Sequence, residues 1–246
     1  MRSWFSCKPS SHGSVAAAPP KPVLYPPTRI AVLSRERERA QAAIDEALEP
    51  AQRERALAIR ADLSDPTSAA AAVAECVKAF GRIDALVNLA GSGAGRVALK
   101  VSKLDDLRFA LAAFTETAFN IALPTVRAML AQPYRDGARS RGRIVTVTAG
   151  SSKAPAPGCG AFGAAKAGVN TLMLAIAREH KIDGIVANAL VLGGVAFAAA
   201  EKFYSPADLA AAATPQEVAD TLTFLASDRS SDINGALVDL NAREID

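Results

Sequence analysis

The chain has 246 residues, half of them hydrophobic, and its 28 basic and 25 acidic residues leave a formal net charge of +3. This length and apolar content fit one α/β domain with a well-buried core better than two domains. The charge is too small and too dispersed for a nucleic-acid-binding surface. The three cysteines have no CxxC spacing and only two histidines accompany them, which argues against a zinc site.

No apolar run approaches the roughly 20 residues that a membrane-spanning helix needs, so the sequence predicts no membrane span. The cysteines are interpreted as reduced thiols, and we expect a cytoplasmic protein. Residues 1–28 are rich in serine and proline and contain no acidic residue. Because Pro19, Pro20 and Pro22 forbid a regular helix, this stretch is predicted to be an irregular arm. A targeting role for it stays open as the alternative.

From Arg29 onward, short apolar runs alternate with helical patterns, so residues 29–246 are predicted to form the folded domain. Ser34 is the expected N-cap of the first helix, and Thr214 with Glu217 forms a capping box before the last one. Strands buried on both faces that alternate with helices indicate an α/β fold with a doubly wound parallel sheet. The expected strands are 30–33, 56–59, 83–88, 143–147, 184–190 and 236–240, and the expected helices 35–48, 64–80, 103–112, 114–132, 162–180 and 214–226.

Four short motifs recur in the order and spacing of a known family. They are Ala61-Asp62-Leu63 after the second strand, Asn88-Leu89-Ala90-Gly91 at the end of the third, Gly142-Arg143-Ile144-Val145 in the fourth, and Phe162 to Lys166 at a helix start. Together they make the chain resemble the short-chain dehydrogenase/reductase family over roughly residues 29–240. The resemblance implies a Rossmann-like fold and a nicotinamide cofactor.

Four residues are the candidates for contacts with that cofactor. The resemblance places Asp62 near the adenine ring and Asn88 and Gly91 at a strand end beside the cofactor. Arg35 stands where members of the family that prefer NADP often carry a basic residue for the 2′-phosphate. Structural interpretations stay open for all four: a capping or loop role for Asp62, a strand-to-helix turn for Asn88 and Gly91, and a solvated helix start for Arg35.

The glycine-rich turn that cradles the pyrophosphate in this family has no good counterpart. Only glycine lets the backbone approach the phosphates there. The segment Ser6 to Gly13 is the one stretch that aligns, and it keeps one glycine of three. The sequence therefore predicts that the N-terminal strand and its glycine turn are degenerate or missing.

The residues that transfer protons in the family are also replaced. The resemblance puts the catalytic tyrosine at Phe162, the catalytic serine at Ala149, and the relay asparagine near Ala113 or Phe114. A phenylalanine has no hydroxyl to exchange a proton, so Lys166 is the one member of the set that remains. We interpret it as vestigial, with its amine bonded to a neighbouring loop carbonyl.

These losses lead to a non-catalytic family member, or pseudoenzyme, as the first hypothesis, with no cofactor expected. The alternative is an NAD(P)-dependent oxidoreductase that reduces ketones or oxidises alcohols with relocated groups, such as Ser151, Ser152 or Tyr204, and with NADP or NAD as cofactor. Tyr134 is a weaker candidate because it lies in a basic loop. A third hypothesis is a small-ligand module that uses the cleft near Gly91, Gly150 and Gly193.

The two long helices near 114–132 and 162–180 are the expected association surface. In the family they form a four-helix dimer interface, and the second helix carries more small and aliphatic residues than one sheet face requires. We therefore expect a homo-oligomer, or a hetero-oligomer with an active family member. The residues that suggest this are Ala164, Ala165, Ala167, Gly168, Leu172, Leu174, Ala175 and Ile176.

Overall fold

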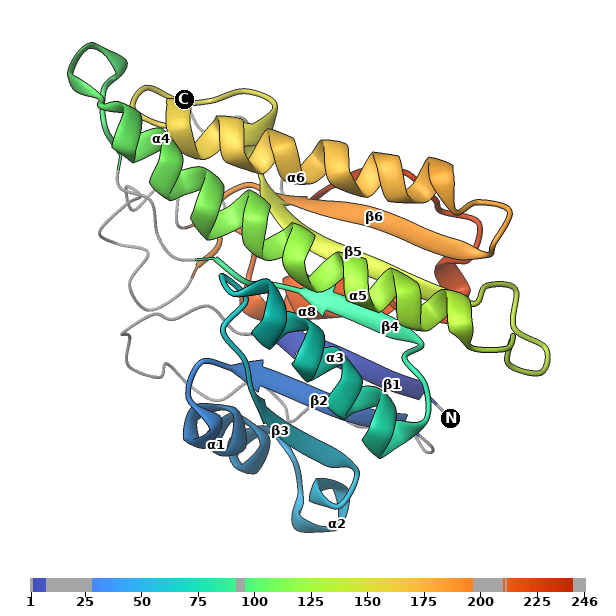
Figure 1. Ribbon diagram of the computed structural model, residues 1–246. Helices are drawn as coiled ribbons and strands as arrows, with labels where there is room; N and C mark the ends of the chain where they lie inside the picture. Colours follow the sequence, from blue (N-terminus) through green and yellow to red (C-terminus); the bar gives the residue numbers. More distant parts are fainter. Residues whose placement is uncertain (1, 8–27, 92–95, 197–209, 211, 241–246) are drawn as a thin grey trace.

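A computed structural model describes residues 2–7 as backbone and residues 28–91, 96–196, 210 and 212–240 with their side chains. Seven parallel strands form one sheet in the order β3-β2-β1-β4-β5-β6-β7 (Figure 1). The order reverses direction between β1 and β4, which defines the switch point of a doubly wound sheet. The predicted fold class is confirmed. The strands are β1 (Arg2–Cys7), β2 (Thr28–Ser34), β3 (Ala56–Arg60), β4 (Ala85–Asn88), β5 (Gly142–Ala149), β6 (Ile185–Leu192) and β7 (Leu237–Leu240).

Strand β1 corrects the prediction for the start of the chain. Residues 2–7 form the central strand of the sheet, paired with β2 from Arg2 to Cys7 and with β4 from Trp4 to Cys7. Strand β2 also begins at Thr28, inside the predicted arm. Backbone hydrogen bonds to a neighbour on each side hold β1 in place despite its short and mixed sequence. The predicted irregular arm and degraded glycine turn otherwise fall on residues 8–27, outside the described residues.

Helices cover both faces of the sheet, and the alternation of buried side chains along the strands assigns each helix to a face. Ala31 and Leu33 belong to the core cluster that also holds side chains of α3, α5 and α6, whereas Ile30 and Val32 pack against the cluster of α1. Figure 1 shows α3, α5 and α6 in front of the sheet and α8 behind it. The helices are α1 (Arg37–Ala47), α2 (Pro50–Arg53), α3 (Pro66–Phe80), α4 (Leu104–Ala110), α5 (Thr117–Ala131), α6 (Gly160–Glu179) and α8 (Pro215–Leu225).

Local sequence signals explain where several helices begin. Asp65 caps α3 by accepting a hydrogen bond from the Thr67 backbone N–H. Thr214 and Glu217 form the predicted capping box at the start of α8. The first helix differs, because α1 begins at Arg37 after Glu36, and Ser34 instead accepts a hydrogen bond from the Glu36 N–H.

The two helices predicted at 103–112 and 114–132 are one continuous rod in the structure. A π-helical segment, η2 (Leu111–Glu116), joins α4 to α5. The wider π turn inserts residues into the helix and re-aims their side chains, which is frequent at functional sites. At this point the rod touches α6, where Thr115 donates a hydrogen bond to the Ala165 carbonyl at 2.8 Å. The segment thereby carries Phe114 toward the carboxyl ends of the strands.

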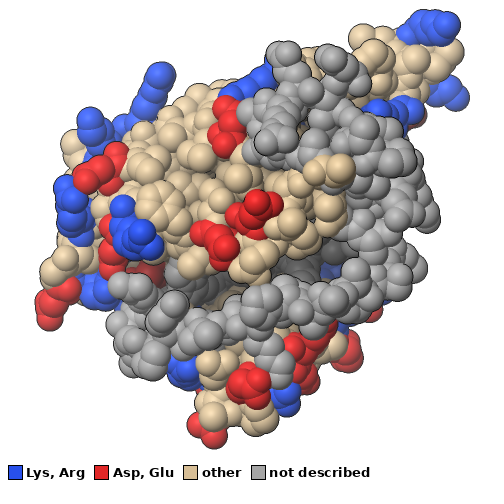
Figure 2. Space-filling model, turned by 180° about the vertical axis from the view of Figure 1, so that it is seen from behind, with Lys and Arg blue, Asp and Glu red and all other residues tan. Residues whose placement is uncertain are grey.

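Both long helices pass a test of length and hydropathy for membrane-spanning segments: residues 104–131 and 160–179. Both also pack on the sheet and supply buried residues to its core, such as Ile121, Met129 and Met173. Burial against a sheet is a sufficient reason for an apolar helix. Seen from behind, charged side chains of both signs are interspersed over the described surface (Figure 2), without a continuous basic stripe.

An ion-pair network closes the amino-terminal edge of the sheet. Arg143 on β5, which is almost completely buried, meets Asp228 at 2.9 Å, and Arg135 meets the other oxygen of Asp228 at 2.6 Å. Arg82 pairs with Asp84 at 2.9 Å beside them. Pairing of this kind offsets much of the free-energy cost of burying a charge. The network marks this edge as structural and leaves the carboxyl edge for the candidate site.

Candidate functional site

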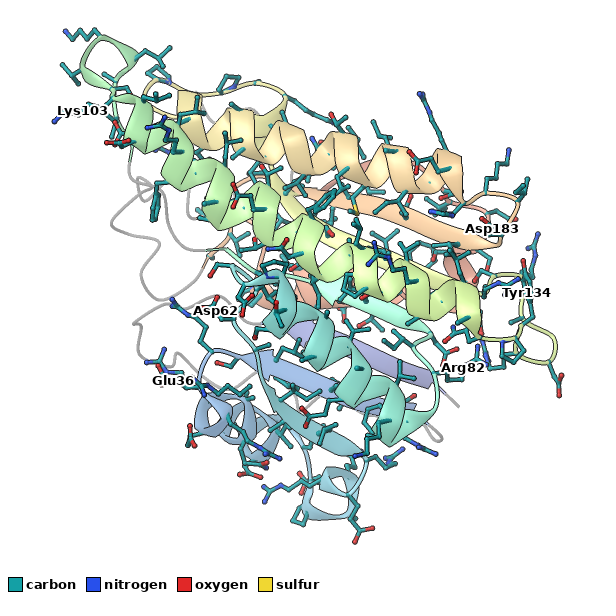
Figure 3. All side chains as sticks on the ribbon, viewed as in Figure 1. Glu36, Asp62, Arg82, Lys103, Tyr134 and Asp183 are labelled. Carbon is teal, nitrogen blue, oxygen red and sulfur yellow. The ribbon has the colours of Figure 1, made fainter. Side chains whose placement is uncertain are left out.

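The residues singled out from the sequence gather at the carboxyl edge of the sheet. Asn88 ends β4, Ala149 ends β5, and Asp62 follows β3. Lys166 lies on the second turn of α6, directly after the loop that leaves β5. In an open α/β sheet this edge, next to the switch point between β1 and β4, is where ligands bind. Figure 3 places Asp62 and Glu36 at this end of the molecule and Arg82, Tyr134 and Asp183 at the opposite end.

Asp62 is held as an exposed anion beside two arginines. Its Oδ1 accepts hydrogen bonds from the Ser64 hydroxyl at 2.7 Å and from the Ser64 N–H at 3.0 Å. These bonds lower the pKa of the Asp62 carboxyl, and the charges of Arg35 and Arg60 lower it further. Arg35 is exposed at the end of β2, and its carbonyl accepts a hydrogen bond from Arg60 at 3.3 Å. Asp62, Arg35 and Arg60 together offer an oriented carboxylate and two cations.

Asn88 and Gly91 shape the turn that leaves β4. Asn88 is buried and accepts a hydrogen bond from the Ala90 N–H at 2.9 Å, which fixes the turn. Gly91 has a φ of 155°, and a Cβ on it would lie 2.4 Å from Cε1 of Phe114. The backbone of Gly91 therefore rests on the Phe114 ring, and a side chain has no room on that side.

Lys166 is the buried cation of the site. It is 7% exposed, and its Nζ donates a hydrogen bond to the Val147 carbonyl of β5 at 3.1 Å. The predicted bond to a neighbouring carbonyl is present, although the acceptor lies in a strand and not in a loop. Burial lowers the pKa of the Lys166 ammonium from 10.5 to about 8.

Two phenylalanine rings enclose this amine. Nζ lies 4.5 Å from the ring centre of Phe114 and 6.0 Å from that of Phe162. The two rings meet edge to face, with centres 5.2 Å apart. Aromatic faces attract a cation, so both rings compensate part of the cost of burying the ammonium. Phe162 stands where the resemblance places the tyrosine, and Phe114 is one of the two positions, with Ala113, near which it places the asparagine. Neither ring carries a polar group.

The candidate serines lie next to this cage in η3 (Gly150–Ser152). Ser152 accepts a hydrogen bond from the Asn170 side chain at 2.8 Å. The Ser151 carbonyl lies 2.4 Å from where a Cβ on Gly163 would be, so η3 packs tightly on α6. Ala149, which stands in the place of the family serine, contributes no hydroxyl.

The two candidate tyrosines fare differently. Tyr134 lies at the amino-terminal edge, with the Arg141 guanidinium 4.8 Å from its ring centre, and is excluded as a proton donor at the carboxyl edge (Figure 3). Tyr204 lies outside the described residues. The three glycines proposed for a ligand cleft all follow strands at this edge: Gly91, Gly150 and Gly193.

Sequence reasoning missed the part that Phe114 plays. The alignment left its position uncertain between residues 113 and 114, and the π turn that aims the ring is not visible in the residue pattern. A signal was nevertheless available. Phe114 is a large aromatic residue that directly follows two alanines, Ala112 and Ala113, in the predicted helix. A ring at this place could fill the space beside a glycine at a strand end.

The contact between Gly91 and Phe114 gives a stability prediction. Replacing Gly91 by Ala forces its Cβ into the ring, and overpacking of this kind costs about 1–3 kcal/mol. Gly81→Ala is the matched control, because Gly81 also has a positive φ but no atom within 4 Å of its Cβ position. The free energy of unfolding is measured in urea. Adding Phe114→Leu should recover part of the stability lost in Gly91→Ala and none of the stability lost in Gly81→Ala. Equal effects in both would show that the ring does not limit Gly91.

The buried ammonium gives a pH prediction. Between pH 8 and 10.5 the folded state releases the Lys166 proton while the unfolded chain keeps it, so the unfolded state binds more protons. The free energy of unfolding contributed by this group therefore rises with pH across that window, by roughly 3 kcal/mol at most. Lys166→Met has no such proton, so the stability difference between wild type and variant should change across the window. Parallel pH profiles would contradict the burial of a charged amine.

Comparisons with known proteins agree with this geometry. A model of the short chain dehydrogenase family matches residues 24–207. Meso-2,3-butanediol dehydrogenase of Serratia marcescens is 30% identical over 207 residues, covering 80% of this chain and 78% of that protein. The 3-ketoacyl-(acyl-carrier-protein) reductase of Brucella melitensis, complexed with NADH, superimposes with a TM-score of 0.78 at 20% identity, covering 89% and 88% of the two chains.

A third similar protein is a Tyr→Phe variant of ElxO with NADPH bound, with a TM-score of 0.76 at 21% identity and 86% coverage of each chain. The relatives are oxidoreductases, so the comparisons favour the oxidoreductase alternative over the non-catalytic hypothesis. The expectation that no cofactor binds finds no support in them. The matched family model, the sequence relative and the sheet order agree: this chain belongs to the short-chain dehydrogenase family.

Proposed function

We propose that this protein is an NADP(H)-dependent oxidoreductase that interconverts a carbonyl compound and an alcohol. The observation that carries the proposal is the central position of β1 between β2 and β4. That strand completes the switch point at which a doubly wound sheet binds a nucleotide. Its presence answers the part of the argument against nucleotide binding that concerned a missing first strand.

The residues at the carboxyl edge fit such a cofactor. The fixed carboxylate of Asp62 and the exposed guanidinium of Arg35 would hold the adenosine end, and the turn that runs from Asn88 to Gly91 would lie beside the cofactor. Lys166 would face the nicotinamide end. The cofactor supplies the hydride. The chain's own residues orient the nucleotide and provide a proton.

Arg35 favours NADP(H) over NAD(H). A guanidinium after the second strand can make charge-assisted hydrogen bonds to a 2′-phosphate, whereas a ribose 2′-hydroxyl is recognised by an acidic residue in this type of fold. Glu36 follows Arg35 directly, but its carboxylate pairs with Arg39 at 2.7 Å. The arrangement therefore leaves Arg35 as the side chain that would distinguish the two nucleotides.

A second candidate has a specific observation in its favour. Phe162 takes the position of the family tyrosine, and its ring packs against that of Phe114, at or next to the position expected for the asparagine. A nucleotide-binding subunit without turnover would tolerate that exchange. Since one structural neighbour is a Tyr→Phe variant that holds NADPH, a phenylalanine replacement and nucleotide binding are compatible within this fold.

Nucleotide titration combined with a turnover assay separates these candidates. NADPH should quench the intrinsic fluorescence and be consumed with at least one member of a carbonyl panel of diacetyl, acetoin and acetoacetyl-CoA. Arg35→Ala should weaken NADPH binding by about tenfold to a hundredfold, the effect of losing a charged hydrogen bond, and leave NADH binding unchanged. Arg37→Ala, an exposed neighbour, is the control. Binding without turnover would favour the second candidate, and absence of binding would contradict both.

We also propose that the protein associates through α5 and α6, with a second copy or a related subunit. Two exposed rings on the α4–α5 rod support this, since Phe109 is 53% and Phe119 is 47% exposed. On α6, Ala164 is exposed and Leu172, Leu174 and Ala175 are half-buried, whereas Ala165 and Ile176 already belong to the core of the chain. Large apolar side chains of this kind mark interfaces when they lie together.

Light scattering of the full chain tests the association. On a size-exclusion column with light-scattering detection, the wild type should have the molar mass of a dimer or larger species. Phe119→Ser should lower that mass toward the monomer, because a serine buries far less apolar area. Ile182→Ser is the matched control, as Ile182 is 93% exposed beyond the end of α6. A monomeric wild type at all concentrations would refute a homo-oligomer.

A further inference from the structure

We propose that Lys166 is the proton source for the substrate oxygen, directly or through one bound water, in the role that the missing hydroxyl at residue 162 leaves vacant. The inference rests on the proposed oxidoreductase function and names the group that completes it. Neither Ser151 nor Ser152, the relocated donors expected from the sequence, is needed for this.

The position of the amine is the first argument. Lys166 lies one turn after Phe162 on α6, and the Val147 carbonyl holds its Nζ at the carboxyl end of β5. That is the edge where the nicotinamide end of the cofactor would lie. A phenol at residue 162 would project from the same helix face, since residues four apart are neighbours on a helix. Lys166 therefore carries transferable protons one helical turn from the position of the missing phenol oxygen.

The protons of the amine are the second argument. An ammonium has three N–H donors, and Nζ makes one hydrogen bond among the described residues. The two aromatic rings beside it attract the charge but bind no proton. Among the described residues, the groups in hydrogen-bond or ring contact with Nζ are Phe114 from η2, Phe162 from α6 and the backbone of β5. None of these groups is ionisable, and burial is the cause of the lowered pKa of the Lys166 ammonium.

Other ionisable groups in the described part of the chain are less suitable. Lys153 lies in the same region, but it is bound to both oxygens of Asp239, at 2.6 and 2.8 Å. His180 contacts Asp183 at the amino-terminal end (Figure 3). Tyr134 lies there too. Lys166 is thus a buried acid at the proposed reaction edge with no carboxylate bound to it among the described residues.

The step is balanced in atoms and charge. The carbonyl carbon receives the hydride that reduced nicotinamide supplies, and the carbonyl oxygen receives a proton from Nζ, giving the alcohol. The neutral amine then takes a proton from water. In the oxidative direction the amine accepts the alcohol proton. A group with a pKa of about 8 is well suited to both directions near neutral pH.

The test uses the full chain with NADPH and the best carbonyl of the panel. Lys166→Met should lower the reduction rate by about a hundredfold, and Lys166→Arg by at least about tenfold while NADPH affinity changes less than about threefold, because arginine keeps the charge but does not release a proton. The wild-type rate should fall above pH 8, and this fall should be absent in Lys166→Arg. Lys153→Met, the matched control, should keep the wild-type rate.

Two further measurements separate a donor from a structural cation. Phe162→Tyr in the Lys166→Met background supplies a new hydroxyl and should recover at least about tenfold of the lost rate. Independently of turnover, NMR of isotope-labelled lysine should show a signal, absent in Lys166→Met, that titrates near pH 8. Turnover that survives Lys166→Met at more than about a third of the wild-type rate, or titration above pH 10, overturns the inference. NADPH binding with no carbonyl reduction in the wild type overturns the oxidoreductase proposal itself and the inference with it.

Discussion

The burial of the Lys166 ammonium is the constraint on which the site depends. An ion removed from water is stable only where other groups replace its hydration. Here one backbone carbonyl and two aromatic faces do so, and the lowered pKa records that the replacement is incomplete. Phe114 and Phe162 therefore have a role of their own beside the buried amine. They form a cage that keeps the amine in place without a hydroxyl beside it.

The cage in turn requires the local architecture. The π turn of η2 aims Phe114 under Gly91, and the absence of a side chain at Gly91 gives the ring its space. The hydrogen bond from Thr115 to α6 holds the two long helices together at the same level. Sheet, rod and α6 thus meet where β4 and β5 end. The ion pairs at the opposite edge fix the strands without occupying this region.

Much of this could be predicted from the residues. The strand and helix pattern and four short motifs gave the fold, because parallel strands buried on both faces leave a clear apolar signal. Asp62, Asn88 and Lys166 were found because the motifs fix their places relative to strand ends. The central strand was not predicted, because Arg2, Ser3 and Ser6 weaken its apolar signal, whereas its stability comes from backbone pairing with two neighbours.

The chemistry was harder to predict than the fold. From the sequence, Phe162 indicates a lost proton donor and hence a non-catalytic protein. The residue type at 162 shows that a hydroxyl is absent, but it does not show which groups surround Lys166. The approach of Phe114 to Lys166 depends on a π turn in the adjoining rod, and such turns leave no periodic signal. A buried amine with a lowered pKa gives the same sequence a different chemical meaning.

A crystal structure of the full chain grown with NADPH tests the central claim most directly. The account predicts ordered density for the nucleotide along the carboxyl ends of β1, β2 and β4, with its phosphorylated ribose beside Arg35 and its nicotinamide toward Lys166. Saturating NADPH with no density at that edge, or a nucleotide bound elsewhere, would contradict it.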